Sequence, residues 1–166
     1  SQDTSGNKKI KINKKEIRKR KDLLGLNNVV VFSPEEESIT KSGPKNRRKF
    51  FNKVFSIVSK SYLEDLLNYN SVLEQRNAVL KRGSKKTINK EIEIWNNPFS
   101  EKGEKLWKQR KKLLVEFLET FKETVKRIDL EIACNISYDQ KISKKEQIRS
   151  VLEGRLDTEI ALGFTT

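Results

Sequence analysis

A run of basic side chains between positions 45 and 53 is the part of this sequence with the clearest chemical use. Its members are Lys45, Arg47, Arg48, Lys49 and Lys53, and no acidic residue lies between positions 37 and 64. Arginine binds phosphate through two parallel hydrogen bonds, and the backbone N–H groups at a helix start add further donors. The run therefore indicates a phosphate-binding surface. The alternative is a solvated helix face, or arginines that pair with carboxylates elsewhere in the fold.

A second basic cluster surrounds an expected turn at residues 83–86. It consists of Arg76, Lys81, Arg82, Lys85, Lys86 and Lys90. A solvated loop is the alternative to a binding role for its lysines. Gln75, Arg76 and Asn77 also interrupt an apolar helical pattern, which suggests a specific polar contact, although a helix surface would explain them more simply. The DNA-binding candidates from both clusters are Arg47, Arg48, Lys49, Arg76, Lys81 and Arg82.

Four aromatic residues could stack on nucleic-acid bases: Tyr62, Tyr69, Trp95 and Trp107. Their helical spacing favours the alternative, in which they pack between helices.

Enzymatic chemistry finds no support in the residue types present. The sequence has no histidine and one cysteine, Cys134, so a zinc site or a catalytic triad is not expected. None of the seven glycines belongs to a P-loop or to a G-x-G-x-x-G pattern. We therefore predict no catalytic, cofactor-binding or metal-binding residue in this chain.

The composition favours an anionic partner. The formal net charge is +13, charged residues make up 36% and hydrophobic residues 34%. Nucleic acid is the first expectation for such a chain, although the lysine bias of an AT-rich genome would also raise the charge. A single cysteine excludes an internal disulfide and favours the reducing cytoplasm. No apolar run approaches membrane-spanning length, so no membrane partner is expected.

Hydrophobic periodicity predicts a mostly helical α+β chain with short strands near both ends. Strands are expected at residues 9–13, 28–32 and 131–138, with a turn at 13–15. Helices are expected from Ser33 onward, at 45–82 with a division near Ser61, at 90–126 with a break or kink at Pro98, and at 144–162. Gly163 is expected to end the last helix.

Four segments resemble the RecF family, and they occur in the family's order. Residues 29–36 (VVVFSPEE) resemble its VVLFSPEDL stretch, and residues 43–50 (GPKNRRKF) resemble its G-x-P-x-x-R-R-x-F-L-D motif. Residues 62–81 resemble Y-L-x-x-L-x-x-Y-x-x-x-L-x-Q-R-N-x-x-L-K. Residues 160–166 (IALGFTT) are similar to the segment before its G-P-H-R strand. Phe51-Asn52 replaces Leu-Asp, and the EDL sequence becomes Glu35-Glu36-Glu37.

The resemblance implies an ABC-type ATPase head related to SMC and Rad50 proteins, of which this chain would be an interior fragment. Residues 1–32 would be the end of the lobe I sheet, residues 33–162 the helical lobe II, and residues 163–166 the start of a return strand into lobe I. The Walker A, signature and Walker B motifs would lie outside this sequence. The full-length protein would bind ATP and Mg²⁺, form an ATP-dependent homodimer, bind single-stranded or gapped DNA, and assist other recombination-repair proteins in DNA replication, repair and the SOS response.

Two other functions remain open at this point. A freestanding basic helical module could bind nucleic acid without nucleotide, and a start codon directly before Ser1 would favour it. An interaction protein could instead use the apolar stripe of residues 106–125 to pair with another helix. Concentration-dependent dimerisation without DNA affinity would favour that alternative.

Overall fold

The computed structural model describes residues 10–17, 23, 38–41, 43–82, 85–129, 131–137 and 144–166. The strand expected at residues 28–32 and the helix start expected at Ser33 lie outside the described residues. The chain forms two compact units, residues 1–60 and residues 61–166, and each has its own architecture. The domain boundaries implied by the resemblance, at residues 32 and 162, stay a prediction.

The first unit contains a two-stranded antiparallel hairpin. Strand β1 (Ile10–Ile12) pairs with β2 (Lys15–Ile17), with Ile10 opposite Ile17. The connecting residues Asn13 and Lys14 have φ angles of 48° and 66°. Positive φ at both turn positions matches the right-handed twist of the flanking strands. The first strand and the turn follow the sequence expectation, whereas the second strand lies where only a charged stretch was expected.

Two helices follow the hairpin in the first unit. They are α1 (Ser38–Lys41) and α2 (Pro44–Val58). Pro44 occupies the first turn of α2, where its missing N–H removes no helical hydrogen bond. Three phenylalanine rings line part of α2, with centroids 5.2 Å apart for Phe50 and Phe51 and 5.6 Å apart for Phe51 and Phe55. These rings give α2 an apolar side, and Lys45, Lys49 and Lys53 lie on another side of the helix.

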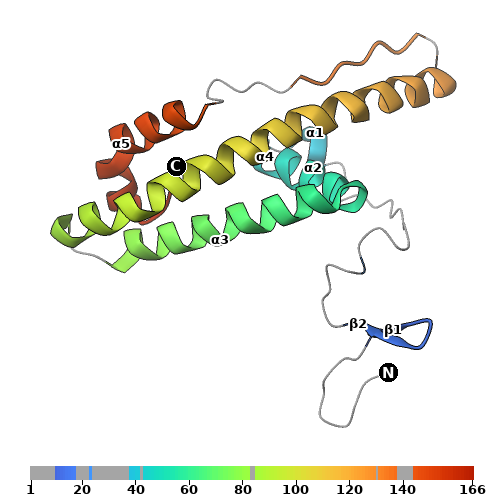
Figure 1. Ribbon diagram of the computed structural model, residues 1–166. Helices are drawn as coiled ribbons and strands as arrows, with labels where there is room; N and C mark the ends of the chain where they lie inside the picture. The colour runs from blue at the N-terminus through green and yellow to red at the C-terminus, as the bar shows by residue number, and fades with distance from the viewer. Residues whose placement is uncertain are drawn as a thin grey trace. The chain divides into compact units, whose positions relative to one another are not determined.

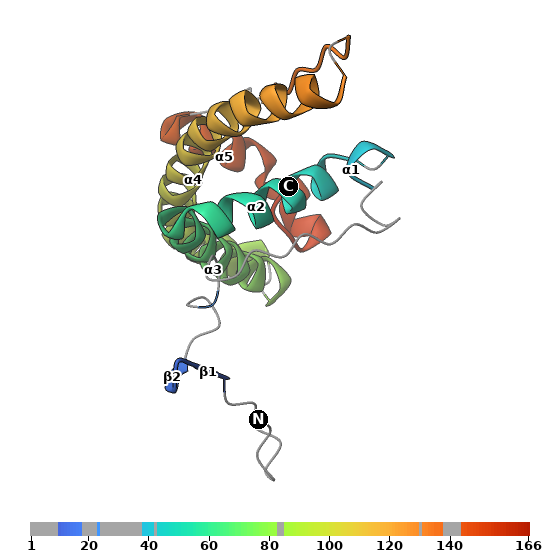
Figure 2. The ribbon, with the colours of Figure 1, turned by 90° about the vertical axis from the view of Figure 1, so that its right-hand side faces the viewer.

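The second unit is a packing of three helices. Helix α3 (Lys60–Arg82) lies beside α4 (Lys85–Ile128) and runs in the opposite direction, and α5 (Lys145–Leu162) packs against the first half of α4 (Figures 1 and 2). At 44 residues, α4 is about 66 Å long from the rise of an α-helix. The division between α2 and α3 falls at Ser59, close to the expected position.

The expected break at Pro98 is wrong, because α4 continues through this residue. Residues on both sides of Pro98 are anchored in the core: Ile92 and Phe99 are 1% and 5% exposed. The Ser100 hydroxyl also donates to the Asn96 carbonyl at 2.7 Å within the same stretch. Tertiary packing of this segment therefore outweighs the one helical hydrogen bond that proline cannot make.

Two hydrophobic clusters hold the three helices together. The first contains Leu80, Ile88 and Ile92 from α3 and α4, with Val79, Leu156 and Ile160 packed against them. The second contains Phe99, Ile148 and Leu152 from α4 and α5, with Tyr69, Val72, Leu73 and Trp107 packed against them. Burial of a side chain of this size stabilises a fold by about 1.5–3 kcal/mol, so these clusters fix the register of the helices.

The strand expected at residues 131–138 is not found in the part of it that is described. Residues 131–137 carry no strand, and among the described residues only β1 and β2 pair in a sheet. An alternating pattern becomes a strand only where a neighbouring strand takes up its backbone hydrogen bonds. At the other end of the unit, α5 ends at Gly163, whose φ of 73° is the left-handed conformation expected there. The mostly helical fold class with a small sheet is confirmed.

Candidate nucleic-acid interface and a buried polar network

Basic side chains cover the first half of α2. Lys45, Arg47, Arg48, Lys49 and Lys53 are all exposed. Lys45, Lys49 and Lys53 repeat every four residues and therefore lie on one stripe of the helix, with Arg48 beside it. No acidic residue occupies the first turn of α2. This arrangement presents cations to solvent near the start of the helix, as a phosphate-binding surface requires.

The second cluster is only partly on the surface. Lys81 and Arg82 are exposed in the last turn of α3, and Arg82 Nε donates to the Ala78 carbonyl at 3.2 Å. Their charges suit the negative end of the helix dipole. Lys90 on α4 is exposed as well. The side chains of Lys85 and Lys86 lie outside the described residues.

Arg76 has a different place from the other candidates, because its side chain is completely buried. Its Nε donates to Asn96 Oδ1 at 3.1 Å, and its Nη1 donates to Thr165 Oγ1 at 2.6 Å. Its Nη2 lies 2.7 Å from Glu159 Oε2, and Glu159 is also 0% exposed. The guanidinium carbon lies 5.7 Å from the centre of the Phe99 ring. Burial among these partners argues against a direct phosphate contact by Arg76 and corrects that expectation.

The same network anchors the residues that follow α5. The Asn77 Oδ1 atom accepts from both the backbone N–H and the hydroxyl of Thr165, each at 2.8 Å. The backbone N–H of Thr166 donates to Glu159 Oε1 at 2.9 Å. Arg76 and Asn77 thus make the specific polar contact that their position in the sequence suggested. We call the set formed by Arg76, Asn77, Asn96, Glu159 and Thr165 the polar clasp.

Ion pairs on the surface join α4 to α5. Lys145 Nζ lies 2.5 Å from Glu101 Oε1, and the Lys145 backbone N–H donates to Glu104 at 3.2 Å. The hydrogen bond and charge of Lys145 lower the pKa of Glu101 below its ordinary value. The hydrogen bond from Lys108 does the same to the pKa of Glu104, with smaller contributions from Lys145. Both carboxylates are therefore charged at neutral pH, where they attract Lys145 at the start of α5.

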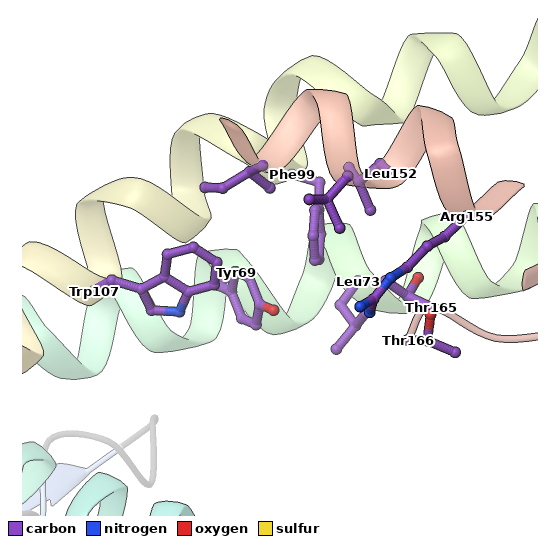
Figure 3. Close-up of a pocket in the computed structure, with 10 residues that line it drawn as sticks. Tyr69, Leu73, Phe99, Trp107, Leu152, Arg155, Thr165 and Thr166 are labelled. Carbon is purple, nitrogen blue, oxygen red and sulfur yellow. The ribbon is translucent and has the colours of Figure 1, made fainter. Parts of the chain in front are cut away.

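Of the aromatic candidates, Tyr62 packs inside the protein, whereas Tyr69 and Trp107 line a cavity. Tyr62 is 0% exposed, and its hydroxyl accepts a hydrogen bond from Arg110 Nε at 3.1 Å. Tyr69 and Trp107 instead line a cavity of about 230 Å³ in the second unit. Figure 3 shows Tyr69 and Trp107 side by side at one end of this cavity, with Arg155 reaching from α5 toward Thr165 at the other. Trp95 is half-buried and is not among the lining residues.

No residue set in the described part of the chain suits a nucleoside triphosphate or a metal ion. Residues 43–82, 85–129 and the other described ranges contain no cluster of three metal-ligating side chains. The described glycines are Gly43, Gly103, Gly154 and Gly163, which stand singly and form no loop that could surround a triphosphate. No described helix is long and apolar enough to cross a membrane. We therefore derive no nucleotide chemistry from these residues.

Sequence reasoning missed Asn96, Glu159 and Thr165 as partners of Arg76, and missed Arg155 at the cavity. A signal was available for Glu159. Glu159 continues the spacing of Ile148, Leu152 and Leu156, which places a carboxylate on the apolar side of α5. A charged residue on such a stripe is rarely buried without a partner of opposite charge. Arg76 interrupts the apolar stripe of α3 in the same way, but no sequence pattern joins the two.

Comparison with known proteins gives a consistent result, although no family model matches the chain. DNA replication and repair protein RecF from Thermoanaerobacter sp. (strain X514) is 35% identical over 172 residues, covering 96% of this chain and 46% of the relative. The protein of the same name from Leptospira interrogans is 29% identical over 160 residues, covering 96% and 43%. That from Clostridium botulinum (strain ATCC 19397 / Type A) is 41% identical over 110 residues, covering 66% and 30%.

Solved structures agree with the sequence relatives. A structure of the recombination mediator protein RecF with ATP, in the RecFOR pathway, superimposes with a TM-score of 0.76 at 27% identity, covering 98% of this chain and 46% of that one. A second RecF structure gives a TM-score of 0.69 at 30% identity. The fold is therefore that of a mostly helical segment of DNA replication and repair proteins. The chain belongs to the RecF family, and it spans less than half the length of the relatives it matches.

Proposed function

We propose that this chain forms part of the DNA-binding surface of a RecF-like protein. In the first unit, the exposed residues Arg47, Arg48 and Lys49 on α2 supply phosphate contacts. In the second unit, Lys81 and Arg82 on α3 do so. The observation that carries the proposal is the exposure of the basic residues of α2, in a chain with RecF relatives. Single-stranded or gapped DNA is the expected ligand, because the resemblance implies it.

We infer the rest of the protein's activity from the resemblance to the family. Residues 1–32 complete a lobe I sheet, residues 33–162 form lobe II, and residues 163–166 lead back into lobe I. ATP and Mg²⁺ bind to the full-length protein through residues outside this sequence. The protein acts in the cytoplasm as an ATP-dependent homodimer and assists other recombination-repair proteins. Support for the ATP proposal comes from the solved RecF structure that superimposes on this chain, which contains ATP.

A charge-removal experiment tests the DNA contacts. The double variant Arg47→Ala/Arg48→Ala removes two exposed guanidinium groups from α2. DNA affinity is measured by fluorescence anisotropy at several salt concentrations. Log K falls as log salt rises, and each lost phosphate contact should make this dependence less steep by about 0.7 on single strands. The slope of the double variant should therefore be less steep by about twice this amount.

The matched control is Lys122→Ala/Lys126→Ala. These two residues are exposed on the last part of α4, so the control removes the same charge from another helix. It should leave the slope close to that of the unchanged protein. Equal slopes for the unchanged protein, the α2 variant and the control would contradict the proposed contacts.

A further inference from the structure

We propose that the cavity lined by Tyr69, Trp107 and Arg155 is a binding site for one nucleotide unit of single-stranded nucleic acid. Its base would lie against the aromatic rings, and its phosphate would meet the Arg155 guanidinium. The proposal rests on the proposed DNA-binding function and deepens it by naming the kind of contact.

The size and lining of the cavity fit a single planar ring system. Its volume of about 230 Å³ is below the 300–1,000 Å³ that is typical of pockets for drug-sized ligands. Tyr69 and Trp107 are half-buried, so each ring keeps part of its surface accessible. Tyr69 is held by Phe99, whose ring centre lies 5.1 Å away. Stacking on such rings is tolerant of base identity, since every base has an aromatic face.

Arg155 is the charged member of the cavity lining. It is exposed, and within the described residues it has no hydrogen bond or ion pair, whereas Arg149 on the same helix contacts Glu153 and Asn97. An arginine without a carboxylate partner keeps its full capacity for a phosphate. Figure 3 shows its side chain directed toward Thr165 rather than away from the helices.

The polar clasp makes one wall of the cavity rigid. Thr165 and Thr166 line the cavity, and both are bonded to clasp residues: Thr165 to Arg76 and Asn77, and Thr166 to Glu159. A wall that is fixed before binding lowers the entropic cost of ordering the site around a ligand. Arg76 therefore supports the wall of the cavity through Thr165 and is itself buried.

The test uses the intrinsic fluorescence of Trp107 in the full-length protein. The sequence has two tryptophans, so Trp95→Phe leaves Trp107 as the reporter from this chain, and any tryptophan outside these 166 residues is replaced by phenylalanine as well. Oligodeoxythymidylate is titrated in, and a fluorescein-labelled form of the same oligonucleotide gives binding by anisotropy. Trp107 emission should be quenched over the same DNA concentrations that raise the anisotropy. Arg155→Ala should weaken binding about tenfold, the size expected for the loss of one hydrogen bond to a charged phosphate.

Arg149→Ala is the control, because it removes a half-buried arginine of the same charge from the same helix, outside the cavity lining. It should change binding little. Binding by anisotropy without a Trp107 response, or equal effects of the two arginine variants, would overturn the cavity site and leave the proposed function standing. Absence of any DNA binding would overturn both. Shielding of Trp107 from acrylamide in the free full-length protein would show that its own chain fills the cavity, and would also overturn the site.

Discussion

Arg76 Nη2 and Glu159 Oε2 lie 2.7 Å apart, and both side chains are completely buried between α3 and α5. Neither atom has another hydrogen-bond partner in the described part of the chain, so the two charges neutralise each other. A buried charge left alone costs far more than a buried pair. The contact therefore makes each residue dependent on the other.

Removing one member of this pair should destabilise the second unit strongly. Arg76→Met leaves the Glu159 carboxylate buried without its partner, so the free energy of unfolding should fall by about 3–5 kcal/mol. The double variant Arg76→Met/Glu159→Leu buries no charge and should be more stable than Arg76→Met alone. Urea unfolding followed by circular dichroism measures both. A double variant less stable than Arg76→Met would mean that the lone carboxylate is not the cause.

Two glycines should respond to alanine in opposite directions. Gly154 lies inside α5, and an added Cβ would meet nothing within 4 Å. Gly154→Ala should therefore stabilise the protein by up to about 1 kcal/mol through its helix propensity. Gly163 has a φ of 73°, which alanine adopts poorly, so Gly163→Ala should cost about 1 kcal/mol or more. Thermal melts of the two variants provide the comparison, and a shift of the same sign in both would be inconsistent with this explanation.

Stability should decrease in acid through the α4–α5 ion pairs. The hydrogen bond and charge of Lys145 lower the pKa of Glu101 below its ordinary value in the folded protein. A carboxyl group with a lowered folded pKa stabilises the fold above its unfolded pKa, and this stabilisation is lost as pH falls through the folded value. The difference in unfolding free energy between the unchanged protein and Glu101→Gln should therefore shrink from about pH 6 to pH 3.

Glu119→Gln is the control for this pH series. Glu119 is exposed on the same helix and has no ion pair within the described ranges. Its substitution should give a difference from the unchanged protein that does not shrink in acid. If the Glu101 and Glu119 variants followed the same pH dependence, the ion pair with Lys145 would not be responsible.

Local signals in the sequence were sufficient to place most of the helices. Gly163 marked a helix stop, and apolar spacing located α3 and α5. These signals act through backbone geometry within a few residues, so they can be recognised without the fold. The contacts of Ile92 and Phe99 with residues distant in the sequence are different. They keep α4 helical through Pro98, and no local pattern in the sequence reveals them.

The candidate site was predictable only in part for the same reason. The exposed stripe on α2 could be read from charge and helical spacing alone. Arg76 has the same charge as the other DNA-binding candidates, so the sequence did not distinguish it from them. Its burial depends on Glu159 and Thr165, which are distant in the sequence. The alternating segment at 131–137 fails as a strand because pairing needs a partner that an alternating pattern does not supply.

The most direct test of the account is the affinity of the full-length protein for DNA as salt is varied. Anisotropy of a labelled single strand and of a gapped duplex would be measured from low to physiological ionic strength. We predict binding to both that weakens steeply as salt rises, because the phosphate contacts release counterions. No binding at low salt, or an affinity that does not change with salt, would contradict the claim that the basic surface of this chain binds DNA.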